Sequence, residues 1–202
     1  MKDYKELTVG VLALQGDFER HLHHLRMLGA KDREIRKPEH LDGLDGLIIP
    51  GGESTTMSKL IDRFGMRQKL FDYCRERAVL GTCAGMIMLS TEVINETRVQ
   101  PLGIIDIAVF RNSYGRQVHS FFTDIKAGLN GSAVTLKASF IRAPKVTRVG
   151  KDIEVLAKFE EDPVLLTRKN CLVSSFHTEL EEDFTLTKFF IDNFIVKNRS
   201  AK

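Results

Sequence analysis

The sequence contains no tryptophan, three tyrosines and three cysteines among its 202 residues. Cys74, Cys83 and Cys171 are an odd number, and no two of them form a C-x-x-C pair. This scarcity argues against a disulfide framework or a cysteine-based zinc site, and it is typical of proteins from a reducing compartment. We therefore predict a cytoplasmic location.

Long hydrophobic runs and an excess of charge of one sign are also missing. No apolar stretch approaches the ~20 residues of a membrane span. The short run at residues 9–14 lacks a small-residue cleavage signature after it, so it indicates a first buried strand rather than a signal peptide. Thirty Lys and Arg residues are interspersed with 27 Asp and Glu residues, for a net charge of +3. Because nucleic-acid binding requires a basic stripe, we predict no nucleic-acid partner. Because no apolar stretch is long enough, we also predict no membrane segment.

What the chain does contain is typical of a globular protein, with 43% hydrophobic and 28% charged residues. A chain of this length buries roughly 70% of its unfolded surface and needs no covalent staples. No linker, repeat or low-complexity tract divides it. We predict a single domain over residues 1–202.

The first half of the sequence alternates between apolar runs and amphipathic segments. The predicted strands cover residues 7–14, 44–50 and 78–80, and the predicted helices cover 18–28, a segment capped by Ser54, 66–77 and 85–93. Such alternation indicates βαβ units and an α/β fold with a doubly wound, mostly parallel sheet. Ligands bind outside the carboxyl ends of the strands in these sheets.

The second half of the sequence is richer in strands separated by short polar or glycine-containing turns. The predicted strands are 102–110, 120–126, 134–142, 152–159, 163–168 and 171–176. We expect them to be antiparallel edge strands of the same sheet. Residues 184–197 are predicted to close the chain as a helix with an apolar face of Phe189, Phe190, Phe194 and Ile195.

The stretch "GTCAG" at residues 81–85 places Cys83 where an apolar strand meets an apolar helix. This G-x-C-x-G pattern is the thiol counterpart of the nucleophile elbow, in which flanking glycines allow a sharp turn and close packing. Unpaired amides at the start of the helix favour a thiolate there. The alternative is a buried cysteine with a packing role.

A thiol nucleophile requires a base, and the base requires an orienting group. His177 ends the apolar run "CLVSSF", and Glu179 follows two positions later, so the two side chains share one face of an extended segment. The alternative is a surface loop with incidental polar residues, because H-x-E alone is a weak motif. Beside the cysteine elbow it becomes the favoured base and orienting carboxylate.

The stretch "PGGES" offers the amides of Gly51 and Gly52 as oxyanion donors, together with the amide of Ala84 after the cysteine. The alternative is a simple turn before a helix cap. No phosphate-binding motif of the form G-x-x-x-x-G-K-[ST] or G-x-G-x-x-G is present.

Two further groups of residues have an open role. His21, His23 and His24 suggest a metal site, but no carboxylate or cysteine completes one, and we favour a solvated helix or a contact surface. Arg111 and Arg142 each follow a hydrophobic strand and could clamp a carboxylate. From the residues alone, an ordinary surface salt bridge is the better interpretation of both arginines.

Taken together, these motifs resemble the triad (class I) glutamine amidotransferases, and among them the glutaminase subunits of pyridoxal 5'-phosphate synthase. The resemblance runs nearly end to end, through "VGVLALQGDFERH", "DGLIIPGGESTTM", "GTCAGMIML", "RNSYGRQVHSF", "FIRAP" and "SSFHTEL". It implies a flavodoxin-like fold, hydrolysis of L-glutamine through a glutamyl-thioester, and no metal or organic cofactor. It also implies that the partner is a barrel-shaped synthase subunit in a large hetero-oligomer, and that docking orders the oxyanion loop near Gly51.

The resemblance also assigns roles to single residues. Cys83 would be the nucleophile, His177 the general base and later acid, and Glu179 the orienting carboxylate. Gly52, Glu53 and Ser54 would line the glutamine pocket. Arg111, Ile141 and Arg142 would bind the amino-acid end of glutamine.

Two positions depart from the family pattern. Thr178 stands where the family usually has proline, which removes a rigid link between the histidine and the glutamate. Arg20, with Glu19 before it, stands where the family tends to have an acidic residue next to the histidine, in a segment implicated in partner docking. Two rival functions remain: a cysteine hydrolase or redox protein related to intracellular proteases, and an interaction subunit that has lost turnover.

Overall fold

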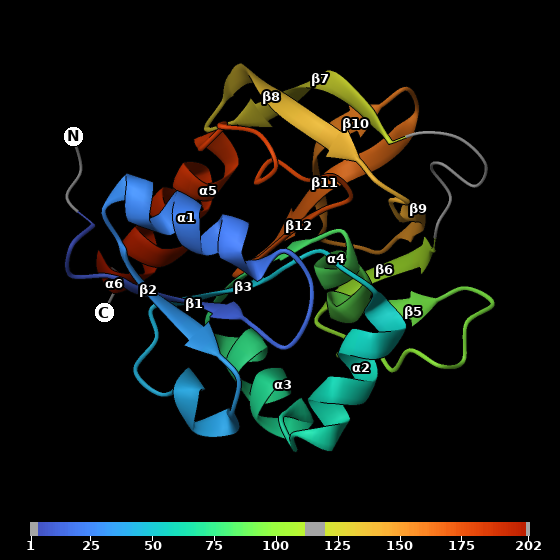
Figure 1. The fold of residues 1–202 in the computed structure, drawn as a ribbon. Helices are drawn as coiled ribbons and strands as arrows, with labels where there is room; N and C mark the ends of the chain where they lie inside the picture. The colour runs from blue at the N-terminus through green and yellow to red at the C-terminus, as the bar shows by residue number, and fades with distance from the viewer. Residues whose placement is uncertain (1–3, 112–119, 201–202) are drawn as a thin grey trace.

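The computed structural model describes residues 4–111 and 120–200 and shows an α/β fold with helices on both sides of a central sheet (Figure 1). The first half of the chain runs through β1 (Thr8–Leu12), α1 (Phe18–Leu28), β2 (Lys31–Ile35), a 3-10 turn (Pro38–Leu41), β3 (Gly46–Ile49), α2 (Ser54–Arg63), α3 (Arg67–Glu76), β4 (Ala78–Thr82) and α4 (Ala84–Leu89). The second half runs through β5 (Ser90–Val93), β6 (Ile105–Phe110), β7 (Phe121–Leu129), β8 (Ser132–Phe140), β9 (Lys145–Val149), β10 (Glu154–Phe159), β11 (Asp162–Arg168), β12 (Cys171–Ser174), α5 (Thr185–Phe190), a π-helical segment (Ile191–Val196) and α6 (Lys197–Ser200).

The main sheet has nine strands in the order β2-β1-β3-β4-β12-β11-β10-β7-β8. The five strands β2, β1, β3, β4 and β12 are parallel to one another, whereas β11, β10, β7 and β8 continue the sheet in antiparallel pairs. The predicted α/β fold with a mostly parallel core and antiparallel edge strands is therefore confirmed.

The parallel strands are apolar on both faces because each face has its own core. Val11, Ile48 and Leu80 pack with α1 and the C-terminal helix in one buried cluster. Their chain neighbours Leu47 and Val79 belong to a second cluster, with residues of α2, α3 and α4. Adjacent strand residues point to opposite faces, so a run of consecutive apolar residues is what a doubly covered strand requires. Figure 1 shows α1 and α5 on one side of the sheet and α2 and α3 on the other.

The predicted arrangement of the second half is wrong in two respects. The strand predicted at residues 171–176 is not an antiparallel edge strand, because β12 pairs in parallel with β4 in the middle of the main sheet. The second-half strands also do not all join one sheet edge. β6 lies in a separate three-stranded sheet of order β5-β6-β9, parallel to β5 and antiparallel to β9. The predicted helix over residues 85–93 is also too long. It ends at Leu89, where the Ser90 hydroxyl donates to the carbonyl of Ile87, and Ser90–Val93 pairs with β6 as β5.

The C-terminal helix is confirmed in place and in its apolar face. Phe190, Phe194 and Ile195 are buried in the core of the α1 side, and Phe189 packs against that core. None of the helices within residues 4–111 and 120–200 has the length and apolar character that a membrane crossing requires.

Candidate active site

Three neighbouring strands bring the predicted site residues together. β3, β4 and β12 are adjacent and parallel, so their carboxyl ends lie at one edge of the sheet. The loop 50–53 follows β3, Cys83 follows β4, and His177 comes three residues after the end of β12. The topology therefore unites residues that are nearly 130 positions apart in the sequence.

Cys83 has the sharp turn expected of a nucleophile elbow. Its backbone has φ 48° and ψ −101°, a strained conformation for a residue with a Cβ. The flanking glycines make the turn possible: a Cβ on Gly85 would lie 2.0 Å from the carbonyl oxygen of Ile49, and one on Gly81 would lie 2.7 Å from the backbone of Gly85. The amide of Cys83 donates to the carbonyl of Ser174 at 2.8 Å, which ties the turn to β12.

His177 and Glu179 form a close buried pair. Nδ1 of His177 lies 2.6 Å from Oε1 of Glu179, and the two residues are 4% and 2% exposed. Two backbone hydrogen bonds of 2.9 Å join His177 to Ser139 in β8. His177 does not end β12, as the sequence suggested, but lies on a short extended segment that β8 holds in place.

Electrostatics favour a charged carboxylate beside a basic imidazole. Burial lowers the pKa of His177, but the charge of Glu179 and hydrogen bonding with Cys83 and Glu179 outweigh it and raise the pKa above its ordinary value. Burial raises the pKa of Glu179, yet its interactions with His21 and His177 hold the pKa well below the usual range. Because Nδ1 of His177 is bonded to Glu179, Nε2 is the ring nitrogen left to exchange a proton with Cys83.

The histidine cluster of α1 is not a solvated helix face, so that expectation is wrong for two of its three members. His21 and His24 are 1% and 2% exposed. Nε2 of His21 lies 3.2 Å from Oε1 of Glu179 and 3.2 Å from the hydroxyl of Thr82. His24 contacts the hydroxyl of Thr187 and the carbonyl of Glu181. His21 and His24 lie beside Leu22 and Leu25 on the buried face of α1, so the helical spacing of the leucines could have indicated this orientation.

A cavity of about 220 Å³ opens beside Cys83 and His177. It is lined by Asp17, Gly52, Glu53, Ser54, Cys83, Ile87, Arg111, Ile141, Arg142 and His177. All six residues assigned to glutamine binding are in this wall. Its volume suits a small molecule rather than a bulky ligand.

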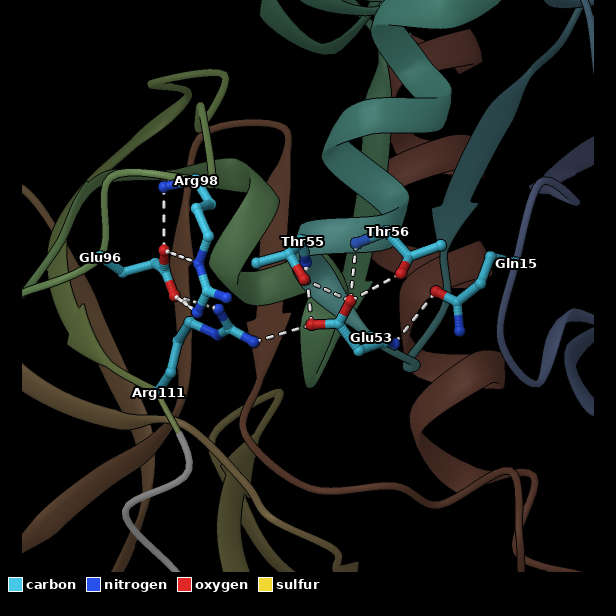
Figure 2. A network of polar contacts seen from close by, with 7 residues as sticks. All are labelled: Gln15, Glu53, Thr55, Thr56, Glu96, Arg98 and Arg111. Atoms are coloured by element: carbon cyan, nitrogen blue, oxygen red, sulfur yellow. Dashed lines mark hydrogen bonds and ion pairs between the residues drawn. The ribbon is translucent and has the colours of Figure 1, made fainter.

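Glu53 is the centre of a polar network at the start of α2 (Figure 2). Its carboxylate accepts hydrogen bonds from the amides and hydroxyls of Thr55 and Thr56, and its own amide donates to Oε1 of Gln15 at 3.0 Å. Burial raises the pKa of Glu53, but these donors lower it to about 2. Glu53 therefore caps α2, and the sequence-based choice of Ser54 as the cap is wrong by one residue.

Arg111 bridges two carboxylates at the cavity wall. Its guanidinium lies 2.8 Å from Oε1 of Glu53 and 2.5 Å from Oε2 of Glu96, which also pairs with Arg98 (Figure 2). Arg142 is exposed, has a φ of 47°, and forms no ion pair with a described residue. Arg142 is thus a cation in the cavity wall without a carboxylate partner in the described part of the chain. The rest of the "RNSYGRQVHSF" motif, from residue 112 to 119, lies outside the described residues.

The glycine loop after β3 lies directly against the imidazole. A Cβ on Gly51 would lie 2.2 Å from Cε1 of His177, and one on Gly16 would lie 1.8 Å from the carbonyl oxygen of Gly51. Gly52 has φ 148°, which favours glycine, and a Cβ there would meet the Gln15 side chain. Ala84 is the first residue of α4, where amides lack intrahelical partners. The predicted oxyanion residues are thus next to the sulfur or the imidazole.

The two departures from the family pattern have different consequences. The amide of Thr178 donates to Oε2 of Glu179 at 3.0 Å, a contact that proline could not make. Glu19 and Arg20 are exposed on the first turn of α1 and touch none of the triad residues. The first departure therefore supports the His177–Glu179 pair, and the second affects only the surface.

Three residues of this region were not identified from the sequence. Asp17 and Ile87 line the cavity, and Glu96 holds Arg111 from the loop between β5 and β6. A lone acidic residue in a loop gives no signal of its partner. Ile87 is one turn after Cys83 in α4, so the elbow motif with helical spacing could have indicated it.

The other two cysteines have a different environment. Cys74 and Cys171 are buried away from the cavity wall, and burial raises the pKa of both thiols, that of Cys171 to about 12. They are protonated at neutral pH and are poor nucleophiles.

Comparison with known proteins gives consistent matches over most of the chain. A sequence profile described as "SNO glutamine amidotransferase family" matches residues 11–196. Curated relatives named "Pyridoxal 5'-phosphate synthase subunit PdxT" include one from Thermosipho africanus, 48% identical over 92% of this chain and 98% of the relative. Others from Francisella philomiragia and Thermus thermophilus are 47% and 45% identical, over 92% of this chain and 98% and 96% of their own lengths.

Solved structures agree. One described as "Crystal structure of glutamine amidotransferase" is 44% identical, with a TM-score of 0.85 over 91% of this chain and 97% of its own. The structure of PurLQS from Thermotoga maritima is 14% identical with a TM-score of 0.70 over 96% of this chain and 99% of its own, which shows a shared fold.

Proposed function

This chain belongs to the SNO glutamine amidotransferase family, and from that premise we propose that it hydrolyses L-glutamine to L-glutamate and ammonia for a pyridoxal 5'-phosphate synthase. The resemblance noted from the sequence motifs is thereby confirmed at the level of the family. The observation that carries the proposal is the placement of Cys83 on a strained turn in the same cavity wall as His177, whose Nδ1 is held by Glu179 at 2.6 Å.

In the first step, the sulfur of Cys83 attacks the side-chain amide carbon of glutamine while its proton passes to Nε2 of His177. Glu179 stabilises the resulting imidazolium through Nδ1. The negative charge that develops on the amide oxygen is accepted by amides from among Gly51, Gly52 and Ala84. His177 then returns the proton to the leaving nitrogen, ammonia departs, and a glutamyl-thioester remains on Cys83.

In the second step, water attacks the thioester with His177 as the general base. The carbon–sulfur bond breaks, the sulfur recovers a proton from His177, and glutamate leaves. Two protonation events at one imidazole therefore serve both halves of the reaction. None of these steps needs a metal or an organic cofactor.

The charges of the cavity wall suit a free amino acid. Arg142, which has no carboxylate partner among the described residues, offers a cation for the α-carboxylate. Glu53 and Asp17 offer anions on the same wall for the α-ammonium group. A zwitterion satisfies both signs, whereas a neutral amide without these groups satisfies neither. Arg111 and the backbone at Ile141 complete this end of the proposed site, together with Gly52 and Ser54.

The relatives' name, which describes them as part of a pyridoxal 5'-phosphate synthase, supports the proposal that the partner consuming the ammonia is a synthase subunit. In the family that the sequence resembles, this partner is barrel-shaped and its docking orders the oxyanion loop. We propose the same dependence here, in a cytoplasmic hetero-oligomer.

The test is the release of glutamate and ammonia from L-glutamine, with and without the synthase subunit. We expect little turnover alone, stimulation by the partner, and loss of turnover in Cys83→Ala and His177→Asn. Cys74→Ala is the matched control, because it removes a thiol that burial keeps protonated. Unchanged turnover in Cys83→Ala would refute the proposal, and absence of turnover in the wild-type complex would favour a non-catalytic interaction protein.

A further inference from the structure

We propose that His21 is a positioning residue of the triad, which fixes the carboxylate of Glu179 and through it the orientation of His177. The inference rests on the proposed glutaminase function but concerns a residue outside the Cys-His-Glu triad. It arises from the histidine cluster of α1, to which the sequence motifs assign no role.

His21 reaches the triad through Glu179, and neither of these two residues lines the cavity. Oε1 of Glu179 lies 2.6 Å from Nδ1 of His177 and 3.2 Å from Nε2 of His21. The hydroxyl of Thr82, the residue before the nucleophile, lies 3.2 Å from the same His21 nitrogen and 3.4 Å from Oε1. Oε1 of Glu179 thus contacts the side chains of both histidines and of Thr82.

Because the carboxylate of Glu179 is buried, it stays ionised only through these contacts. The Glu179 side chain is fully buried, and that of His21 is 2% exposed. A buried carboxylate without donors shifts its pKa and becomes neutral. The interactions with His21 and His177 instead hold the pKa of Glu179 well below its usual range.

The direction of the His21 hydrogen bond follows from chemistry. An ionised carboxylate only accepts hydrogen bonds, so Nε2 of His21 must carry the proton and donate. Nδ1 of His21 has no hydrogen-bond partner in the described part of the chain, so Nε2 makes the polar contacts of this ring. The ring therefore works through one nitrogen, and that nitrogen points at the triad.

Loss of this donor has a specific consequence. Oε2 of Glu179 is held by the amide of Thr178, and Oε1 must stay in line with Nδ1 of His177. Without His21, the carboxylate loses a charge-assisted bond, a loss that corresponds to roughly 10- to 100-fold in a rate that depends on it. The cavity wall does not include His21, so glutamine binding is not affected.

The experiment compares three variants in complex with the synthase subunit. His21→Met removes the donor but fills similar space, and His21→Gln keeps an N–H group at the position of Nε2. His24→Met is the matched control, because His24 lies one turn later on α1 and is equally buried, but bonds Thr187 and Glu181 instead of the triad. The measurements are kcat and KM for glutamine, the rate of labelling of Cys83 by an electrophilic glutamine analogue, and the melting temperature.

We expect His21→Met to lower kcat and the labelling rate by roughly 10- to 100-fold with an unchanged KM. His21→Gln should recover most of both rates, and His24→Met should leave them within about twofold despite a similar loss of melting temperature. If His21→Met turns over like the wild type, or if His24→Met loses as much activity, the positioning role is wrong.

A further variant covers the case in which His21→Met does not fold. His21→Asn keeps an amide at this position on a side chain one methylene shorter than that of His21→Gln, so its N–H group stops short of the carboxylate. The proposal requires faster turnover and labelling in His21→Gln than in His21→Asn, and equal rates in the two variants overturn it. Inactivity of the wild-type complex would instead overturn the proposed function.

Discussion

At the residue level, two carboxylates of the site, Glu179 and Glu53, are each held by more than one donor. Glu179 is contacted by His177, His21, Thr82 and the amide of Thr178. Glu53 has four donors from Thr55 and Thr56, in addition to Arg111. Such redundancy fixes the position of each carboxylate, which is what an oriented nucleophile and substrate require.

The Glu96–Arg111 pair gives a first prediction at this scale. Glu96→Gln removes one of the two anions that hold the Arg111 guanidinium against the cavity wall. Because the triad is not touched, we expect KM for glutamine to rise about three- to tenfold with little change in kcat. Steady-state kinetics of the complex measure both constants.

The control for this prediction is Glu92→Gln in β5, whose side chain is 55% exposed and lies 4.0 Å from Arg148. It should leave KM unchanged. A Glu96→Gln enzyme with a normal KM and a reduced kcat would show that Glu96 acts on the chemistry rather than on the binding of the substrate.

Residues with local motifs were predictable from the sequence, and residues with only spatial partners were not. Cys83 stands in a G-x-C-x-G turn, and His177 and Glu179 stand two positions apart, so neighbouring residues carry the signal. His21 and Glu96 contact residues 158 and 15 positions away, respectively. Nothing in the sequence around them specifies those partners.

At the scale of elements, the elbow between β4 and α4 depends on close backbone packing. Gly85→Ala would place a Cβ 2.0 Å from the carbonyl oxygen of Ile49 in β3, and backbone on both sides leaves little room to relax. We expect a loss of more than about 2 kcal/mol in the free energy of unfolding, because overpacking in a core is destabilising. Urea unfolding followed by circular dichroism measures it.

Gly128→Ala in β7 is the matched control, because a Cβ there would meet no atom closer than the carbonyl oxygen of Leu156 at 3.9 Å. It should change the free energy of unfolding by less than about 0.5 kcal/mol. Equal effects of the two substitutions would show that the packing of the elbow is not what makes Gly85 necessary.

The elements predicted from the sequence were those with a strong apolar pattern. β1, β3 and β4 are buried on both faces and stand out as apolar runs. β2, with the sequence KDREI, is an edge strand with one fully buried residue. Because most of its residues are charged, it lacks the apolar pattern from which a strand is predicted. β5 and β9 were missed for a similar reason, because they flank β6 in a small sheet and are largely exposed.

At the scale of the whole molecule, the parallel core could be predicted because alternation of strand and helix allows few topologies. The division of the second half into two sheets could not be predicted, because the residues of an antiparallel strand do not indicate which sheet edge it joins. The site is built on β3, β4 and β12 at the centre of the main sheet, and of these only β3 and β4 were predicted as parallel core strands, because β12 was expected at the antiparallel edge.

The carboxylates also determine how the stability of the whole molecule depends on pH. Glu53 has a pKa of about 2 in the folded protein against an ordinary 4.5, and the pKa of Glu179 is lowered as well. Each therefore contributes stability that is present above about pH 4.5 and is lost as the pH falls through the folded-state value. His177, with a raised pKa, contributes below its ordinary 6.5 and loses that contribution as the pH rises through its folded-state value.

We therefore expect the urea midpoint to fall as the pH drops below about 4.5, and to fall less in Glu53→Gln than in the wild type. Glu76→Gln, an exposed position on α3, is the control and should follow the wild-type curve. Parallel curves for Glu53→Gln and the wild type below pH 4.5 would contradict the role given to the Glu53 network.

The proposed mechanism requires that Cys83 forms the covalent bond to glutamine. Its most direct test is peptide mapping by mass spectrometry after the complex is treated with an electrophilic glutamine analogue, with excess L-glutamine as competitor. We expect one adduct, on the peptide that contains residue 83, which glutamine suppresses and which is much slower to form in His177→Asn. An adduct on Cys74 or Cys171 instead, or labelling that proceeds equally well without His177, would contradict it.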